Sequence, residues 1–213
     1  MNVLYLYAHQ EPESFNAAMK DTAVAAFEEK GDNVSVSDLY AMNFKPVLDE
    51  NDFQNRKNPD KFNPFVEQLH ANKTDSFAPD IKEEMNKVNW ADMLIFQFPL
   101  YFTGFPAIMK GWIDRVLTPG FAFNPLTNSA YDTGLLKGKK AMLVTTAGAD
   151  KDWYTSGGMH GDIHELLKNI THCTLEFVGL EVLPKHVVYG ASSLSEEDGN
   201  KELEKYKELI LSL

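Results

Sequence analysis

The sequence predicts an α/β fold: one domain over residues 1–213 with a doubly wound parallel sheet of five strands, in the order 2-1-3-4-5, and helices on both faces. Segments 3–8 and 92–98 are apolar at most positions and do not alternate, which is typical of parallel strands covered on both faces. Stretches with helical spacing separate the strand-like segments along the chain. Strands alternating with helices indicate βαβ units and a parallel sheet.

The first βαβ unit occupies residues 3–37. Strand 3–8 is followed by a short polar loop, and Ser14 is the expected N-cap of a helix whose apolar positions run from Phe15 to Phe27. Gly31 ends this helix, and residues 33–37 alternate as the second strand. We expect the crossover between the two strands to be right-handed.

The middle of the chain begins with a long excursion. Residues 46–79 contain Pro46, Pro64 and Pro79 among many polar residues, which predicts loop with a short helix near 65–69. A helix at 81–90 and a buried third strand at 92–98 follow. The next helix, 105–116, has the clearest apolar stripe in the sequence.

The last third of the chain repeats the alternation. Residues 139–146 form the fourth expected strand, and a loop over 147–158 leads to a helix with Ile163, Leu167 and Ile170 facing inward. Gly179 ends that helical region, 182–189 is the fifth strand, and an amphipathic helix ends near Leu213.

Charge and composition exclude several classes of protein. Thirty-one acidic residues against twenty basic ones give a formal net charge of −11, which repels a nucleic-acid backbone, so no nucleic-acid partner is expected. The longest apolar run near the start is far shorter than the ~18 residues of a membrane span, so stable membrane insertion is not expected. The single cysteine, Cys173, and the absence of a recognisable signal segment indicate a reducing, cytoplasmic setting.

Ligands in such a sheet bind beyond the carboxyl ends of its strands, at the point where the strand order reverses. This rule selects the loops 9–16, 99–104 and 145–160. Neither a Gly-rich dinucleotide fingerprint nor a P-loop is present. The helix start at Ser14-Phe15-Asn16 could hold a phosphate through its free N–H groups, or Ser14 could simply cap the helix.

Aromatic and titratable side chains gather in the same loops. Tyr101, Phe102, Phe123, Trp153 and Tyr154 are candidates either for the core or for the walls of a site that holds a flat redox ring. His160 is a candidate for proton chemistry, with Tyr154 close to it in sequence. His160 and His164 have metal-ligand spacing, but no third ligand is recognisable and we predict no metal. No serine-hydrolase elbow occurs.

Six segments resemble, in matching order, the NAD(P)H:quinone oxidoreductase (DT-diaphorase) family. They cover nearly the whole chain: His9-Gln10-Glu11-Pro12 with Ser14-Phe15-Asn16, residues 96–101, residues 106–112, Gly120-Phe121-Ala122-Phe123, Thr145-Thr146-Ala147-Gly148 and residues 154–162. The resemblance implies a flavodoxin-like fold.

The resemblance also implies a homodimeric flavoenzyme that takes hydride from NADH or NADPH and passes two electrons to a quinone or related aromatic acceptor, in a ping-pong cycle. The expected cofactor is FAD, and FMN is the alternative because the family's adenine contacts have no clear match. Tyr154 and His160 match the proton-relay pair and are the expected catalytic residues. The expected flavin-binding residues are His9, Ser14, Phe15, Asn16, Ala17, Ala18, Asn63, Pro99, Leu100, Tyr101, Phe102, Thr103, Thr145, Thr146, Ala147, Gly148 and Tyr154. Substrate is expected to meet Phe123, Asn124, Pro125, Tyr154 and His160.

Four positions depart from the family pattern. Phe102 and Thr103 stand where the family tends to have Trp-Phe, Ala147 replaces a glycine, and Glu176 replaces the second histidine of the metal-binding relatives. Two other functions stay open from the sequence. The same fold serves as an ancillary partner of a potassium-efflux system, and as a one-electron flavodoxin-like carrier.

Overall fold

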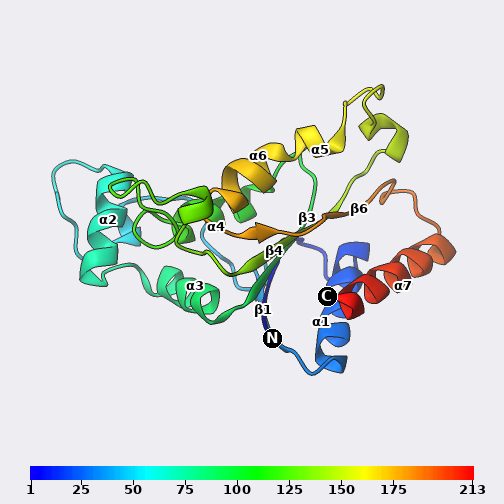
Figure 1. Ribbon diagram of the computed structural model, residues 1–213, viewed down its shortest axis with the longest axis horizontal. Coiled ribbons are helices and arrows are strands. Elements are labelled where there is room, and N and C mark those ends of the chain that lie inside the picture. The colour runs from blue at the N-terminus through cyan, green and yellow to red at the C-terminus, as the bar shows by residue number, and fades with distance from the viewer.

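The computed structural model describes residues 1–213 and contains the expected twisted parallel sheet (Figure 1). The strands run in the order β2-β1-β3-β4-β5, and β6 also pairs with β4. The strands are β1 (Asn2–Tyr7), β2 (Asn33–Asp38), β3 (Met93–Pro99), β4 (Lys140–Thr146), β5 (Glu181–Val182) and β6 (His186–Val188). The longer helices are α1 (Phe15–Glu29), α2 (Pro64–Thr74), α3 (Pro79–Trp90), α4 (Ala107–Val116) and α7 (Glu196–Ser212).

The expected fifth strand is divided into two short segments. β5 pairs with the start of β4 and β6 pairs with its end, so both occupy one position in the sheet. Pro184 lies between them and has no N–H group to donate, which interrupts the ladder. The predicted strand order is therefore confirmed, while the predicted continuous strand over 182–189 is wrong.

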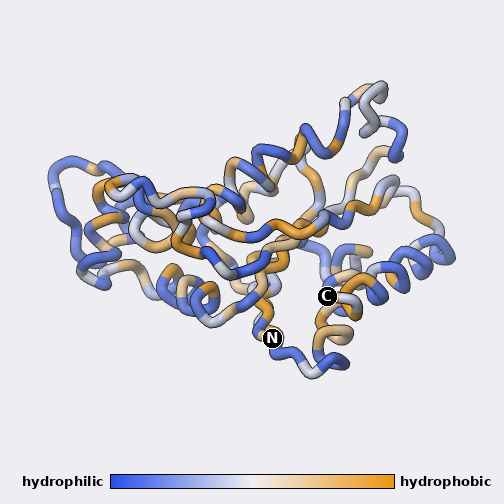
Figure 2. Tube along the Cα trace, viewed as in Figure 1, coloured by the Kyte–Doolittle hydropathy of each residue, from blue (hydrophilic) through white to orange (hydrophobic).

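Each face of the sheet has its own core. Alternate residues of β1 and β3, such as Tyr5 and Ile95, pack with α1 and α7 on one face. Their neighbours Leu6 and Phe96 pack with α3, α4 and the segment after β4 on the other. Figure 2 shows this pattern as apolar stretches along the central strands between helices that are largely hydrophilic outside. Both faces are covered, which explains why the central strands lack alternation.

The region after β4 is less regular than a single helix. It begins with the 3₁₀ turn η3 (Lys151–Tyr154) and continues with α5 (Ile163–Leu166), α6 (Lys168–Ile170) and the π-helical turn η4 (Thr171–Glu176). Another 3₁₀ turn, η2 (Tyr131–Thr133), lies before β4. The inward positions Ile163, Leu167 and Ile170 are buried as the spacing predicted. Gly179 has φ +94°, which suits the glycine that ends this region.

The excursion over 46–79 is more ordered than its composition predicted. It contains the 3₁₀ turn η1 (Glu50–Asp52), and α2 extends beyond the expected 65–69 at both ends. Arg115 of α4 is 1% exposed and binds the buried Asp52 through Nη2 and Oδ1 at 2.9 Å. Its Nη1 also donates to the Lys45 carbonyl at 2.8 Å. This buried ion pair fastens the excursion to the helix that lies beneath it.

Candidate active site

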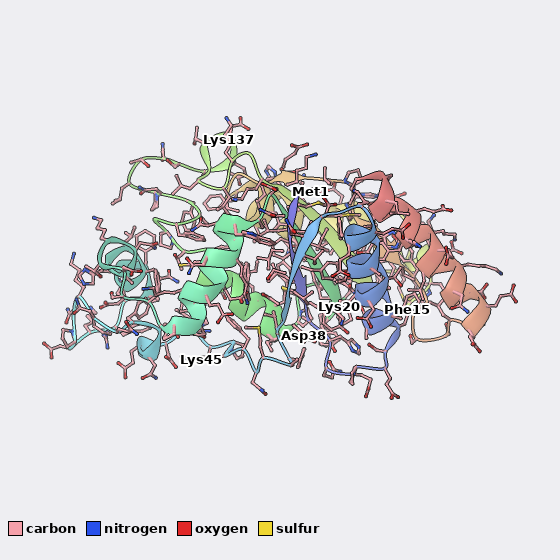
Figure 3. All side chains as sticks on the ribbon, turned by 90° about the horizontal axis from the view of Figure 1, so that it is seen from below. Met1, Phe15, Lys20, Asp38, Lys45 and Lys137 are labelled. Carbon is pink, nitrogen blue, oxygen red and sulfur yellow. The ribbon has the colours of Figure 1, made fainter.

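The three loops selected from the sequence meet at the carboxyl edge of the sheet, as parallel strands require. Leu100 after β3 donates its N–H to the Thr146 carbonyl at the end of β4, at 2.9 Å. The hydroxyl of Tyr101 lies 3.4 Å from Oε1 of Gln10 in the loop after β1. Figure 3 shows Phe15, Lys20 and Asp38 at this edge, with Met1 at the opposite one. The candidate site is therefore built from segments far apart in sequence.

The start of α1 has the features of an anion-binding helix N-terminus. Ser14 caps the helix, since its Oγ accepts from the Ala17 N–H at 3.1 Å, so the structural reading of Ser14 is confirmed. The first turn of α1 contains no acidic residue, whereas α7 begins with three, Glu196, Glu197 and Asp198. The positive end of the α1 dipole therefore has no acidic partner within its own first turn, although Glu13 and Glu196 line the neighbouring cavity.

A cavity of about 270 Å³ lies between the beginnings of α1 and α7. The two helices run side by side in the same direction, because Phe15 approaches Gly199 near their starts and Lys30 bonds the Ile210 carbonyl near their ends. Ser14, Phe15 and Ala18 line the cavity from α1, and Ser195 and Leu203 line it from α7. A ligand phosphate at the α1 start would have this cavity beside it.

The loop after β3 is a tight and strained turn. Tyr101 and Gly104 exchange backbone hydrogen bonds at 3.2 and 3.0 Å, and the two residues between them, Phe102 and Thr103, have φ of +50° and +57°. Side chains other than glycine rarely adopt this conformation, and each instance costs about 1–2 kcal/mol. The Phe102 side chain is fully exposed and Tyr101 is 43% exposed. Backbone strain that displays aromatic side chains is typical of binding sites.

The loop after β4 supplies a buried wall. Thr145, Thr146 and Ala147 are buried, and Gly148 follows at the surface. Ala147 has no positive φ, so an alanine fits where the resembling family has glycine. Its N–H donates to the Val188 carbonyl at 2.8 Å, which fixes this turn to β6. Pro99 and Leu100, at the end of β3, are half-buried beside it.

Tyr154 and His160 lie together at this edge of the sheet. Their ring centroids are 5.1 Å apart, and the His160 N–H donates to the Trp153 carbonyl at 2.9 Å. Tyr154 is buried and also packs on Tyr189, whereas His160 is exposed. Burial raises the pKa of the Tyr154 hydroxyl, which therefore keeps its proton near neutral pH. Tyr154 can therefore donate a hydrogen bond to a ligand, and His160 can exchange a proton at the same position.

The turn that carries this pair depends on glycine. A Cβ atom on Gly158 would lie 2.2 Å from the Asp152 carbonyl oxygen, a distance that no side chain can accept. A Cβ on the neighbouring Gly157 would meet nothing within 4 Å. Gly158 therefore permits the close return of the chain that brings His160 against Tyr154.

Four predicted residues lie away from this cluster within the chain. Asn63 is exposed and caps α2, accepting from the Val66 N–H at 3.3 Å, and α2 lies at the far end of the molecule from α5 in Figure 1. Phe123 packs on Phe177 with ring centroids 5.1 Å apart, and Asn124 and Pro125 follow it. The aromatic partner of Phe123 is thus Phe177, whereas those of Tyr154 are His160 and Tyr189.

Two features were missed by sequence reasoning. Tyr189, at the end of β6, packs on Tyr154 with centroids 5.7 Å apart. Gln97, the one polar residue in the apolar run of β3, bonds to the start of α1 and is completely buried. The signal for Gln97 was present in the sequence, since an amide inside a buried strand requires hydrogen-bond partners.

A further cavity of about 380 Å³ opens next to the α1 start, at the ends of β1 and β2. His9, Gln10, Ala17, Lys20 and Asp38 line it, so it adjoins the candidate site on the β2 side. Lys20 is half-buried and pairs with Asp21 at 2.7 Å.

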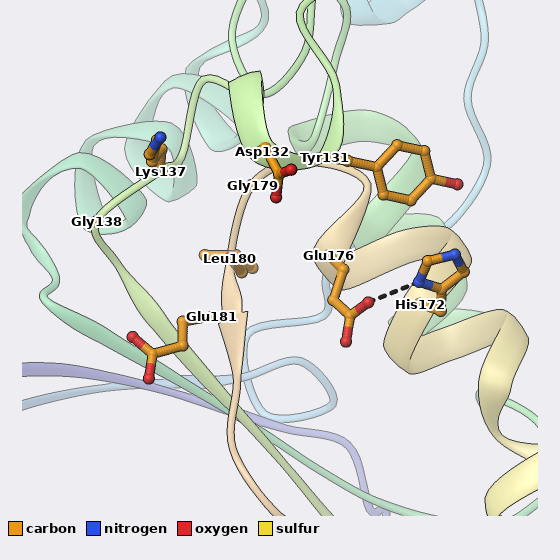
Figure 4. Close-up of a pocket in the computed structure, with 9 residues that line it drawn as sticks. All are labelled: Tyr131, Asp132, Lys137, Gly138, His172, Glu176, Gly179, Leu180 and Glu181. Carbon is orange, nitrogen blue, oxygen red and sulfur yellow. Dashed lines mark hydrogen bonds and ion pairs between the residues drawn. The ribbon is translucent and has the colours of Figure 1, made fainter.

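The largest cavity, about 660 Å³, lies elsewhere (Figure 4). It is lined by nine residues, among them Tyr131, Lys137, His172 and Glu176, and by none of the predicted site residues. Nδ1 of His172 lies 2.6 Å from Oε2 of Glu176. No group of three or more histidine, cysteine, aspartate or glutamate side chains in the structure could hold a metal ion.

Comparison with known proteins agrees with the fold. A family model described as "Flavodoxin-like fold" matches residues 1–210. The chain is 44% identical over 212 residues, 99% of its length and 91% of the relative's, to ribosyldihydronicotinamide dehydrogenase [quinone] of Mus musculus. It is also 45% identical to NAD(P)H dehydrogenase [quinone] 1 of Cavia porcellus, over 88% of this chain and 68% of the other. The chain belongs to this quinone-dehydrogenase family of flavodoxin-like proteins.

Solved structures of flavodoxin-like proteins extend the comparison. The crystal structure of a proposed quinone reductase from Klebsiella pneumoniae superimposes with a TM-score of 0.93 at 37% identity, covering 98% of this chain and 83% of that one. General stress protein 14 of Treponema denticola, solved in complex with FMN, shares the fold at 20% identity with a TM-score of 0.66, covering 99% and 95% of the two chains. None of the helices in this chain has both the length and the hydropathy needed to cross a membrane.

Proposed function

We propose that this protein is a flavin-dependent NAD(P)H dehydrogenase that reduces quinones by two electrons at a time. The observation that carries the proposal is the Tyr154–His160 pair, held 5.1 Å apart at the same sheet edge as the α1 start and the loops after β3 and β4. A simple electron carrier has no need of such a pair. The names of the relatives at about 45% identity support the same reaction.

The residues present fit a flavin. The first turn of α1, without acidic residues, offers N–H donors to a phosphate, and the exposed aromatic turn at Phe102 offers a flat apolar surface to a ring. His9, Phe15 and Asn16 lie on the phosphate side, whereas residues 99–103 and 145–148 would embrace the ring. When bound, the flavin supplies the chemistry that accepts hydride and returns it to the acceptor.

The chain's own residues manage charge and protons during this transfer. The Tyr154 hydroxyl has no side-chain hydrogen-bond partner that shifts its pKa, and burial raises that pKa further above the neutral range, so the hydroxyl keeps its proton. It can therefore donate to a ring atom that gains negative charge, the role expected of a preorganised donor. His160, exposed beside it, can exchange that proton with solvent.

FAD is the flavin that the structure favours in our proposal. The 270 Å³ cavity between the starts of α1 and α7 lies next to the expected phosphate position, so it offers a place for the adenosine half of FAD. FMN would leave that cavity without a ligand. Reconstitution of the apoprotein with each flavin, followed by measurement of both dissociation constants, tests this choice, and tighter binding of FMN would reverse it.

We also propose a cytoplasmic homodimer in which the site is completed between chains. An apolar groove of about 360 Å³, lined by Phe65, Leu117, Phe123 and Phe177 among others, lies on the face that carries the isolated substrate residues. A two-fold arrangement would place this face of one chain against the Tyr154–His160 face of the other. Sedimentation equilibrium of the holoprotein tests the dimer. The lone cysteine, Cys173, is free, as is usual in the cytoplasm.

Anaerobic titration tests the reaction itself. Reduced flavin should form with NADH, NADPH or ribosyldihydronicotinamide, the donors to which the names of the two groups of relatives point. Oxidised flavin should return when menadione is added after the donor is removed, as a ping-pong cycle requires. A flavin that no donor reduces would refute the proposal and favour a regulatory role, and a highly populated one-electron state would favour a carrier.

A further inference from the structure

The face of the sheet that packs on α1 and α7 contains one continuous line of buried polar groups within an otherwise apolar core. Tyr206 of α7, Tyr5 of β1 and Gln97 of β3 are each 0% exposed, and Asn16 of α1 is 6% exposed. The Tyr206 and Tyr5 hydroxyl oxygens are 3.0 Å apart. The Tyr5 hydroxyl donates to Oε1 of Gln97.

The line continues to the candidate flavin site. Nε2 of Gln97 donates to the backbone carbonyl of Asn16 at 2.6 Å, and Nδ2 of Asn16 donates to Oγ1 of Thr146 at 3.1 Å. Asn16 lies in the first turn of α1 and Thr146 ends β4. The line therefore joins the far helix α7, through two central strands, to two of the segments that form the site.

Burying these polar groups destabilises the fold unless each one forms a hydrogen bond, because a buried amide or hydroxyl without a partner loses its hydration without replacing it. Apart from the Tyr7 hydroxyl, the rest of this core is apolar, with Val3, Met19, Ala23 and Ile95 all fully buried. An aliphatic side chain in place of Gln97 would suit these surroundings equally well. The polar side chains are thus not required to fill the core. Their specific effect is on the residues at the end of the line, Asn16 and Thr146, whose positions they fix.

We propose that Gln97 is a positioning residue for flavin binding: through the Asn16 carbonyl it holds the first turn of α1, with its N–H donors, in register with the loops after β3 and β4. Tyr5 and Tyr206 hold the Gln97 amide in the orientation in which its N–H group faces Asn16. The phosphate cradle is then formed before the flavin arrives, which lowers the entropy lost on binding. This inference rests on the proposed function, because it assumes that the site at α1 takes a flavin.

The test measures flavin affinity of the apoprotein, by fluorescence quenching, alongside the free energy of unfolding in urea. Gln97→Met removes both amide bonds and should raise the dissociation constant for FAD about ten-fold. Tyr5→Phe keeps the core shape and removes the hydroxyl that bonds both Gln97 and Tyr206, so the Gln97 amide loses the partner that orients it and a rise of about three-fold is expected. If Gln97→Met does not fold, the flavin affinity of Tyr5→Phe decides whether the Gln97 amide has a positioning role.

A second buried polar cluster provides the matched control. Glu84, 0% exposed on the opposite face, accepts from Trp112 Nε1 at 2.7 Å and from Ser37 Oγ at 3.1 Å, and has no link to Asn16. Glu84→Gln should lower stability while leaving the flavin dissociation constant within about two-fold of wild type. If it weakens flavin binding as much as the Gln97 variant at equal loss of stability, Gln97 is merely structural and the inference is wrong.

The outcomes separate this inference from the proposed function. A wild-type apoprotein that binds neither FAD nor FMN would refute the proposed function, and this inference with it. A wild type that binds flavin, with Tyr5→Phe and any folded Gln97→Met binding it equally well, would refute the positioning role alone.

Discussion

Replacement of Tyr154 by phenylalanine removes one hydroxyl and little else. The ring is 8% exposed and packs between His160 and Tyr189, and phenylalanine preserves both contacts. Burial alone shifts the pKa of this hydroxyl, with no hydrogen bond from another side chain contributing, so its loss leaves no side-chain partner unsatisfied in the apoprotein. We therefore expect the free energy of unfolding to change by less than about 0.5 kcal/mol.

The rate of hydride transfer should respond much more strongly. A hydrogen bond to a group that carries charge contributes about 1.5–3 kcal/mol, and if it forms only as charge develops on the flavin, its loss slows the step about 10- to 150-fold. Stopped-flow reduction of the bound flavin by NADH without oxygen measures this step directly. His160→Gln should slow the same step by about 100-fold, the range of general acid–base catalysis.

A second tyrosine–histidine pair supplies the control. Tyr131 and His172 have ring centroids 5.0 Å apart and lie in the separate cavity of Figure 4. Tyr131→Phe should leave flavin reduction unchanged, because it keeps the ring that packs on Phe177 and removes only a hydroxyl that does not belong to the Tyr154–His160 pair. Unchanged reduction in Tyr154→Phe and His160→Gln, with flavin still bound, would refute the proton role, and equal slowing in Tyr131→Phe would show that the effect is not specific to the site.

Three further predictions follow from the packing. Gly158→Ala should slow flavin reduction at least about ten-fold, since its Cβ would lie 2.2 Å from the Asp152 oxygen, whereas Gly157→Ala should have no such effect; equal rates in both would contradict the close approach. Arg115→Ala should lower the free energy of unfolding in urea by about 3 kcal/mol by leaving Asp52 buried with only Lys45 as its cationic partner, and a loss below about 1 kcal/mol would contradict that account. His186 stacks on Tyr206 with ring centroids 4.8 Å apart and lies near Glu202 and Lys205, and burial lowers its pKa below the ordinary 6.5. The unfolded state therefore binds a proton at higher pH than the folded state, so the free energy of unfolding should fall as the pH drops below 6.5. His186→Phe should reduce this dependence, and an unchanged pH profile of stability would contradict the account.

Much of the fold could be predicted because the relevant signals are local. Ser14 at the N-cap, the apolar stripe of α4 and the unbroken apolar runs of β1 and β3 each depend on neighbours within a few residues. The division of the fifth strand was missed although Pro184 is visible in the sequence. A proline interrupts a strand pair only at a position whose backbone N–H would otherwise donate to the neighbouring strand. Whether position 184 is such a position depends on which edge of the strand faces β4.

Part of the candidate site could also be predicted, because the ends of the strands are marked by local signals. The carboxyl ends of parallel strands meet at one edge, so the loops after β1, β3 and β4 could be selected without coordinates, and the structure brings Tyr154 and His160 together within one of them. Asn63 and Phe123 could not be placed this way, since they lie on an excursion and a surface loop whose positions depend on long-range contacts.

The sequence by itself determined the alternation of strands and helices, and with it the parallel α/β architecture and the candidate loops, because hydrophobic periodicity and helix caps act over short distances. Only the tertiary structure decided that Gln97 reaches Asn16, that Arg115 fastens the excursion to α4, and that Phe123, one of the expected substrate residues, packs on Phe177. The first two contacts join residues 81 and 63 positions apart, and no local pattern specifies which distant partner a buried polar group will meet.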